Sequence, residues 1–588
     1  MGQVGNLRPI DNRLGAGTEQ LSAARDVPSK DRPSLVSTLV PGTKNVGEIM
    51  KRYADGLLRR QFLGGAGALV LGGLGGTKLL LRAQAPANTA AGAGDLALVN
   101  GKIHTMDPNN RVVSQVLIQS GRFAAVGNNI SVPRGNVRRI DLKGRTVIPG
   151  LIDAHNHIVL VGNRPGWHTP LEHVFTIPEA VAALKARSAG VPPGEFITTI
   201  GPVAASQFVE GRLPALAELD AVDRPVYIQA AQGGTRTNSQ GKAWLEARGV
   251  MVAADGAIAG RALTAALLAL RKELLTPETR KRSALDALKY YAALGVTTHR
   301  DCGAFQSDEL SGGLANENTY TMHNPFLALH REGAMPARLR IDFLHQDSPT
   351  ANPPLPTLSQ RLKNSFPFFG DEWIRTGGIG EFTGGGVEGL KAIARAGWRA
   401  EDHALNLAMV TNLIKDRETV NAEIPLSGLR WIISHVPEFP LDLANRMNAM
   451  GMGVLVGWGP LRTGTNVGPP YRMLMNHPIR KGYHSDGGDI TVINPWLNFL
   501  TIVTSRNLAG QQILGDQTLM RQEMLWLATA ANKWFIEEDD LGSIEIGNHA
   551  DLAVLDRDYF AVPDEDLKRT RSLLTVVGGK VVHNDGVL

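Results

Sequence analysis

The sequence predicts an α/β protein: a TIM-type (β/α)8 barrel with a small discontinuous β-sandwich domain built from both ends of the mature chain. Three observations predict it. Apolar runs of β type alternate with helical segments over the central region. Short alternating strands lie on both sides of that region. One apolar run ends in two histidines. With 588 residues, 43% of them hydrophobic, the chain is long enough for both cores.

Residues 1–94 are expected to be a disordered leader with an export signal. Residues 1–55 are polar and rich in Gly, Pro and Ser. Arg59 and Arg60 precede a short Gly- and Ala-rich run, which resembles a twin-arginine signal read by an export machinery. The uncharged span Gln61–Thr77 is short and glycine-rich, so it makes a poor permanent membrane helix.

This signal predicts an exported protein, in the bacterial periplasm or outside the cell, without a stable membrane span after signal cleavage. An uncleaved anchor and a cytoplasmic protein are the alternatives. The charge pattern excludes general nucleic-acid binding. Residues 1–94 carry twelve basic and six acidic residues, and residues 95–588 carry 49 basic and 50 acidic residues. The high pI of about 9.2 therefore comes from the leader and not from the folded part.

The β-sandwich domain is expected to combine residues 95–149 with residues 544–588. Alternating apolar residues and turn residues in both segments predict its strands. The expected strands are Leu96–Asn100, Lys102–Met106, Val116–Gln119, Arg122–Val126, a strand within Gly547–Leu555, and the hairpin Leu573–Val577 with Lys580–His583.

The barrel is expected to span residues 150–543. Repeated strand-then-helix patterning predicts buried strands at Val226–Ala231, Val296–Asp301, Leu339–Leu344, Trp373–Thr376, Leu429–His435 and Gly453–Trp458. Helices are predicted at Arg271–Leu294 and Leu390–Ala396. The strand candidates exceed eight, so Phe196–Ile200 is assigned to an insertion. Asp301–Pro325 and Asp347–Pro356 are expected to be loops near the barrel mouth.

The segment Val147–His157 predicts a metal site. It is a β-branched run that ends in His155 and His157. Residues two apart on a strand point to the same face, so both imidazoles should emerge together from its C-terminal end. Imidazole is a common ligand of catalytic transition metals. Three further polar residues end or follow apolar segments, where barrel enzymes carry their catalytic groups: His403, His435 and Asp486.

With these residues, the chain resembles the amidohydrolase superfamily over residues 95–588. The resemblance is to the branch of D-aminoacylase-like and N-substituted formamide deformylase-like proteins. Pro149–His157 is similar to the first-strand motif of that family, and Gly295–Thr298 and Gly547–Leu555 are also similar. The resemblance implies that His155, His157, His403 and Asp486 bind a divalent metal. It also implies that His435 orients water or polarises the substrate oxygen, and that Asp486 is the general base.

The chain also differs from the family pattern. Arg375 stands where a metal-bridging carboxylated lysine is expected, and a guanidinium stays protonated and cannot bridge metals. This favours one metal ion, with zinc preferred over iron or manganese for nitrogen and oxygen ligands. Glu381 is close enough in sequence to act as a substitute bridge to a second metal. The loop after Val226–Ala231 has Gln232 and no histidine, so relatives' substrates do not carry over.

Four other residues are weaker site candidates. His299 lies near the end of a predicted strand and is a candidate neighbour of the site. Trp167, Trp458 and Arg462 are candidate substrate-binding residues in loops. Cys302, the only cysteine, excludes disulfides within the chain and has no base at a recognisable spacing, so a buried structural role is expected.

The predicted function is hydrolysis of a non-peptide C–N bond in an amide, cyclic amide or N-formyl group by a metal-activated water. An ester or lactone hydrolase with the same site is the alternative within enzymes. A degenerate barrel that binds a metabolite without converting it is the alternative from another class. The expected partner is a small-molecule substrate, and association into a homo-oligomer is left open.

Overall fold

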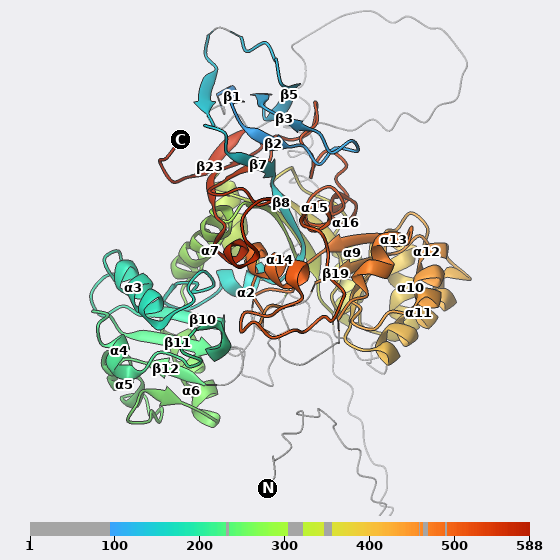
Figure 1. The fold of residues 1–588 in the computed structure, drawn as a ribbon. Helices are drawn as coiled ribbons and strands as arrows, with labels where there is room; N and C mark the ends of the chain where they lie inside the picture. The colour runs from blue at the N-terminus through green and yellow to red at the C-terminus, as the bar shows by residue number, and fades with distance from the viewer. Residues whose placement is uncertain are drawn as a thin grey trace, which may run out of the picture. The chain divides into compact units, whose positions relative to one another are not determined.

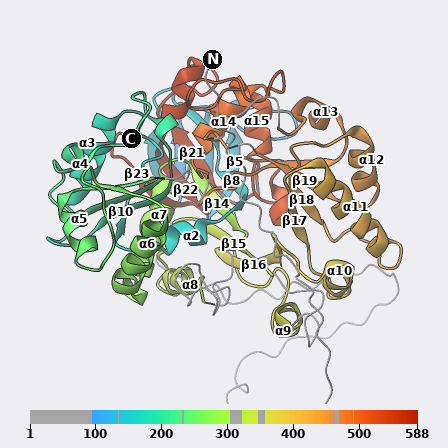
Figure 2. The same cartoon turned by 90° about the horizontal axis from the view of Figure 1, so that it is seen from below.

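The fold is taken from a computed structural model (Figures 1 and 2). It describes residues 94–133, 135–230, 234–303, 321–345, 356–457, 459–461, 468–488 and 491–588. The expected leader, the twin-arginine pair Arg59 and Arg60, and the candidates Trp458 and Arg462 lie outside the described residues. In the part of the chain that is described, no helix combines the length and the apolar character needed to cross a membrane.

Eight parallel strands of the described chain form two four-stranded sheets. The first sheet has the order β16-β15-β14-β8, with β8 Leu151–Asn156, β14 Val296–Asp301, β15 Arg338–Phe343 and β16 Ile374–Ile379. The second has the order β17-β18-β19-β20, with β17 Glu401–Ala404, β18 Ile432–His435, β19 Gly453–Val456 and β20 Arg480–Tyr483. A parallel bridge between Ile379 and Ala400 links the two sheets. This is a TIM-barrel-type α/β fold.

Helices surround these strands in Figure 2 and bury the main hydrophobic core against them. They are α2 Ile158–Gly162, α7 Pro277–Ala292, α8 Asn324–Arg331, α9 Pro356–Asn364, α10 Gly386–Arg395, α11 Leu407–Asn421, α12 Leu441–Ala449, α13 Tyr471–Asn476, α14 Pro495–Thr504, α15 Arg521–Leu527 and α16 Lys533–Ile536. The connections from β14, β15, β19 and β20 to the next helix are long, so the carboxyl ends of the strands carry loops that can form a site.

The single helix predicted at Arg271–Leu294 is wrong. Two helices occur there, α6 Arg261–Leu274 and α7 Pro277–Ala292. Thr276 caps the second helix by accepting a hydrogen bond from the backbone N–H of Thr279, and Pro277 occupies its first position. Proline has no N–H and a φ suited to helix starts, so it ends the first helix and begins the second.

An inserted α/β unit lies between β8 and β14. Its sheet has the order β13-β12-β11-β10-β9. The unit, green in Figure 1, contains two apolar cores of its own. The elements are β9 Trp167–His168, α3 Ile177–Ser188, β10 Ile197–Val203, η1 Ala205–Gln207, α4 Leu216–Leu219, β11 Val226–Ala230, β12 Thr235–Thr237, α5 Ser239–Glu246, β13 Ala257–Ile258 and α6. The structure confirms Phe196–Ile200 as inserted. It also corrects Val226–Ala231, which pairs with β10 and is not a barrel strand.

The two ends of the described chain meet in a module of two sheets. One sheet has the order β5-β4-β1-β6 and the other β23-β22-β21-β7-β2-β3, and residues from both share one apolar core. The elements are β1 Leu96–Val99, β2 Lys102–His104, β3 Val112–Val113, β4 Gln115–Gln119, β5 Arg122–Gly127, β6 Arg138–Asp141, β7 Thr146–Pro149, β21 Leu552–Leu555, η3 Asp564–Arg569, β22 Ser572–Val577 and β23 Lys580–Asn584. β7 pairs with β21 and runs almost directly into β8, so this module fixes where the first barrel strand begins.

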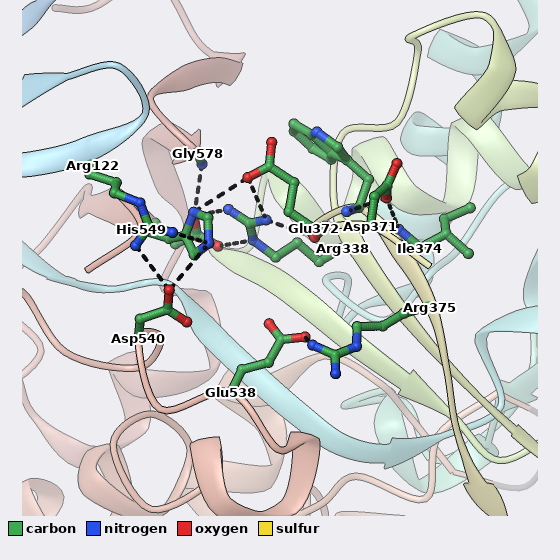
Figure 3. Close-up of polar contacts among 12 residues, drawn as sticks. Arg122, Arg338, Asp371, Glu372, Ile374, Arg375, Glu538, Asp540, His549 and Gly578 are labelled. Carbon is green, nitrogen blue, oxygen red and sulfur yellow. Dashed lines mark hydrogen bonds and ion pairs between the residues drawn. The ribbon is translucent and has the colours of Figure 1, made fainter. Parts of the chain in front are cut away.

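Ion pairs lie at the amino ends of the barrel strands, and one of them joins the strands to this module (Figure 3). Arg338, the first residue of β15, donates two hydrogen bonds to Asp551. Arg340 and Arg375 both pair with Glu538. Arginines with so little exposure require such partners, because an unpaired buried charge is strongly destabilising. The opposite ends of the same strands are left for the site.

Candidate metal centre

The centre is built on the two histidines that end β8. His155 is completely buried and His157 nearly so, and their rings lie edge to face with centroids 5.5 Å apart. The segment that follows β20 lies beside these histidines. Its Asp486 N–H donates a hydrogen bond to the His155 carbonyl, and the His157 N–H donates one to its Gly487 carbonyl. The loop after the last barrel strand is therefore held against the end of the first.

Two carboxylates face these imidazoles. Glu381, which follows β16, places Oε2 at 3.3 Å from His155 Nε2 and Oε1 at 3.5 Å from His157 Nε2. Asp486, which follows β20, places Oδ1 at 3.4 Å from both Nε2 atoms. Four potential ligand side chains from three strand ends thus converge on one point.

Each of these four nitrogen–oxygen separations is close to the spacing of ligand atoms around a tetrahedral metal ion, and Glu381 approaches the two histidines with different oxygens. Zinc bonds of about 2.0–2.1 Å put the ligand atoms of a tetrahedral site about 3.3–3.4 Å apart. Within the described chain, His155 Nε2 and Glu381 Oε2 are buried and have no hydrogen-bond partner. Buried polar atoms are normally satisfied, so two unsatisfied ligand atoms facing each other are consistent with a site for a cation. The residues present therefore fit a divalent metal.

Two further histidines extend the cluster beyond this point. His403, at the end of β17, places Nδ1 at 3.5 Å from Glu381 Oε2. His435 ends β18, and its ring centroid lies 5.4 Å from that of His155 and 5.7 Å from that of His403. Ligand atoms of His155, Glu381, His435 and Asp486 all lie within 4.8 Å of one another. Glu381 thus contacts His403 as well as the strand-one pair, His155 and His157.

Hydrogen bonds from the other ring nitrogens orient the strand-one pair. His155 Nδ1 lies 2.5 Å from Glu401 Oε1, and His157 Nδ1 lies 2.7 Å from the Gly303 carbonyl. The carbonyl can only accept, so His157 Nδ1 carries the proton. Each contact directs Nε2 toward the cluster, as is usual for metal-binding histidines.

A fully buried charge network lies beneath the cluster. Arg300 pairs with Glu401 at 2.5 Å and also with Asp342, and none of the three side chains is exposed. Arg399 lies 3.4 Å from Asp342. The guanidinium of Arg300 keeps Glu401 ionised, so that this carboxylate can hold His155.

The charges within the cluster shift several pKa values. Burial lowers the pKa of His157, but the carboxylates of Glu381 and Asp486 outweigh it and raise that pKa to about 9. Burial raises the pKa of Asp486, but the nearby imidazoles of His435, His155 and His157 hold it well below its ordinary value. Burial lowers the pKa of His435 to about 4. The metal-free cluster thus combines protonated strand-one imidazoles with ionised carboxylates.

The structure places three predicted candidates away from this cluster. Arg375 pairs with Glu538 near the start of β16, at the other end of the barrel strands (Figure 3). Arg375 as a neighbour of the site is therefore wrong, since Glu381 faces the histidines, and the number of metal ions stays a prediction. His299 lies within β14. Its ring packs edge to face against Tyr291, and its Nδ1 forms a hydrogen bond with the Asn156 side chain.

Trp167 contacts three charged side chains, none of which belongs to the cluster. Its indole N–H donates to Glu195, and its ring packs against the guanidinium groups of Arg282 and Arg187, at 3.6 and 5.1 Å. The ring is therefore occupied by contacts with its neighbours. Cys302 is completely buried, and burial raises the pKa of its thiol to about 12, which excludes a nucleophilic thiolate near neutral pH.

The sequence analysis missed Glu401, Arg300, Gly303 and His484. Glu401 could have been found, because it lies two residues before His403 and a strand turns both side chains to one face. His484 is buried, with its ring 4.7 Å from that of His435, and it precedes Asp486 by two residues. The carbonyl of Gly303 has no signal in the sequence.

Comparisons with known proteins agree with this arrangement. An N-substituted formamide deformylase from Arthrobacter pascens is 34% identical over 135 residues, 22% of this chain and 24% of that enzyme. The chain thus matches only about a quarter of the length of this curated relative. A metal-dependent hydrolase of uncharacterised function from Pyrococcus furiosus has a TM-score of 0.51 at 18% identity, over 79% of this chain and 100% of the other.

An atrazine chlorohydrolase from Arthrobacter aurescens TC1, solved with zinc, has a TM-score of 0.51 at 17% identity, over 83% of this chain and 95% of the other. At such identities these two likenesses speak for the fold alone. The sequence pattern of the Amidohydrolase family matches residues 138–583, which include every ligand candidate of the cluster. Because this match covers well over half of the chain, the protein belongs to the Amidohydrolase family.

Proposed function

We propose that this protein is a metal-dependent hydrolase that cleaves a non-peptide C–N bond of a small molecule, in an amide, a cyclic amide or an N-formyl group. One observation carries the proposal. The Nε2 atoms of His155 and His157 each lie 3.3–3.5 Å from a carboxylate oxygen of Glu381 and of Asp486, close to the separation of ligand atoms around a tetrahedral divalent ion. They stand at the carboxyl ends of the strands, where enzymes of this fold carry their catalytic groups.

The proposed ligands of a first ion are His155, His157, Glu381 and Asp486. Glu381 also lies 3.5 Å from His403, and His435 stands beside His403. We therefore propose a second ion held by Glu381, His403 and His435, in place of the single ion expected from Arg375. Ligands that offer only nitrogen and oxygen suit zinc, with iron and manganese as alternatives.

Asp486 and His435 carry the proposed chemistry. A divalent metal, when bound, supplies a Lewis acid that makes water a nucleophile near neutral pH. The ionised Asp486 carboxylate takes the proton of the attacking water and passes it to the leaving nitrogen. His435 is neutral because burial lowers its pKa to about 4, so it would offer one ring nitrogen to the second ion and the N–H of the other to the oxygen that becomes negative on the attacked carbon.

Substituting Glu381 tests the metal site. Glu381→Gln keeps the size but removes the charge that faces three histidines, so we expect metal content to fall to a small fraction of the wild-type value. Elemental analysis of purified protein measures it, and wild type should hold two ions per chain. Glu388→Gln, at an exposed position of α10, is the matched control and should keep both ions. Wild-type protein without metal, after expression in metal-replete medium, would overturn the proposal.

Metal binding should weaken as the pH falls. In the metal-free protein the pKa of His155 is raised well above its ordinary value and that of His157 to about 9, so protons compete with the metal below that pH. We expect the apparent affinity for zinc to fall about tenfold per pH unit for each proton displaced. Chelator competition between pH 6 and 9 measures it, and an affinity that does not change with pH would contradict the pKa directions.

Two further features are proposed: closure of the barrel and export of the protein. The eight strands would close into a complete barrel, supported by the Ile379–Ala400 bridge and the hydrogen bond from Asp486 N–H to His155. Arg59 and Arg60 support export of the protein through a twin-arginine signal. Sequencing the amino terminus of the mature protein tests export, because an intact Met1 inside the cell would refute it.

A further inference from the structure

The turn that follows β14 holds the second metal-binding imidazole. Gly303 accepts a hydrogen bond from His157 Nδ1 at 2.7 Å through its carbonyl. The φ of Gly303 is +78°, and a Cβ there would lie 3.2 Å from the Met322 side chain. Few residues other than glycine tolerate this backbone conformation, and glycine by itself restrains the turn least. The position of the Gly303 carbonyl therefore depends on what fixes the turn.

Asp301, the last residue of β14, fixes that turn. Its carboxylate is completely buried and uses both oxygens. Oδ2 accepts a hydrogen bond from Gly303 N–H at 3.2 Å, and Oδ1 accepts one from Val159 N–H at 3.1 Å. Val159 lies two residues after His157 in the chain. The Asp301 carboxylate thus holds the backbone that follows His157. It also holds the turn whose Gly303 carbonyl accepts a hydrogen bond from the His157 ring.

His323 completes the arrangement from a third segment. It precedes α8, its side chain is 8% exposed, and its Nε2 lies 2.7 Å from Asp301 Oδ2. Asp301 therefore receives three hydrogen-bond donors from three parts of the chain. A buried carboxylate with this many donors is fixed in position, and it transmits that position to the groups it holds.

We infer that Asp301 and His323 are positioning residues that hold His157 in the tautomer and orientation that direct Nε2 to the metal. This rests on the proposed function, because the ion that His157 would bind is itself proposed. Outer partners of metal-binding histidines typically contribute about 10–100-fold to metal affinity. His155 has its own direct partner, Glu401, so loss of Asp301 should disturb one ligand and leave the other in place.

Three variants test the inference: Asp301→Asn, His323→Leu and His323→Gln. Asparagine replaces one acceptor oxygen of Asp301 with a donor, and leucine removes the donor of His323. Glutamine keeps an N–H near the position of Nε2. The matched control is His330→Leu within α8, the helix that follows His323, since His330 Nε2 lies 2.6 Å from Asp371 Oδ2, far from the cluster.

The measurements are the affinity for Co²⁺ by chelator competition, the visible absorption of the Co²⁺-loaded protein, and the Tm of the metal-free protein. We expect Asp301→Asn and His323→Leu to weaken Co²⁺ binding about 10–100-fold and to change the absorption bands. His323→Gln should restore affinity to within a few fold of wild type, and His330→Leu should bind as wild type does.

Two results would overturn the inference while the proposed function stands. One is wild-type Co²⁺ affinity and absorption in Asp301→Asn and His323→Leu. The other is a loss of affinity that follows the Tm of the metal-free protein in all variants, the control included, since that is a general loss of stability. Wild-type protein that binds no Co²⁺ at all would refute the proposed function, and the positioning role with it.

Discussion

Asp486→Asn should lower kcat by about 10²–10⁴-fold, the usual contribution of a general acid–base group. Asparagine keeps an oxygen where Asp486 Oδ1 faces both strand-one imidazoles at 3.4 Å, but it cannot accept a proton from water. The pKa of Asp486 is held well below its ordinary value, so the wild-type carboxylate is ionised at neutral pH and ready to act as a base. The loss should therefore appear in kcat at full metal occupancy.

The assay measures release of amine or ammonia from a panel of N-formyl amines, cyclic amides and simple amides, with metal content determined on the same samples. Asp442→Asn, in the first turn of α12, is the matched control and should keep wild-type kcat. An Asp486→Asn variant that holds its metal and turns over at the wild-type rate would assign the base to another group. Loss of metal in this variant would instead show Asp486 to be chiefly a ligand.

Arg300→Met should destabilise the protein by about 3–5 kcal/mol, the largest effect expected on folding. Arg300 is completely buried between Glu401 and Asp342, which are also completely buried. Methionine fills part of the space but leaves Glu401 without its guanidinium partner and Asp342 with that of Arg399 alone. A buried pair contributes little net stability compared with an apolar replacement, whereas removal of one partner leaves an uncompensated charge.

Urea denaturation of metal-free protein measures this change, with Arg446→Met as the control. Arg446 pairs with Glu418 at 2.7 Å, but both side chains are more than a third exposed, so we expect a loss of less than about 1 kcal/mol. Metal affinity should also fall in Arg300→Met, since Glu401 holds His155. An Arg300→Met variant as stable as the control would show that Glu401 and Asp342 find other partners or take up protons.

The sequence by itself determined the parts of the site that follow from local patterning. Alternation along a strand put His155 and His157 on one face, and the apolar runs placed His403 and His435 at strand ends. The Amidohydrolase family confirms the resemblance read from these residues. The strand-and-helix alternation predicted the fold class, although Thr276 and Pro277 divided a helix that periodicity alone had joined.

Only the tertiary structure decided which residues meet. Arg375 and Glu381 are six residues apart, but an extended chain covers about 3.3 Å per residue, so they can lie about 20 Å apart at opposite ends of a strand. Strand register placed Glu381 among the histidines and Arg375 against Glu538. The partner of His155 lies 246 residues away in Glu401, and that of His157 is a backbone carbonyl. Sequence periodicity describes one element at a time, and contacts between distant elements depend on packing that no single segment encodes.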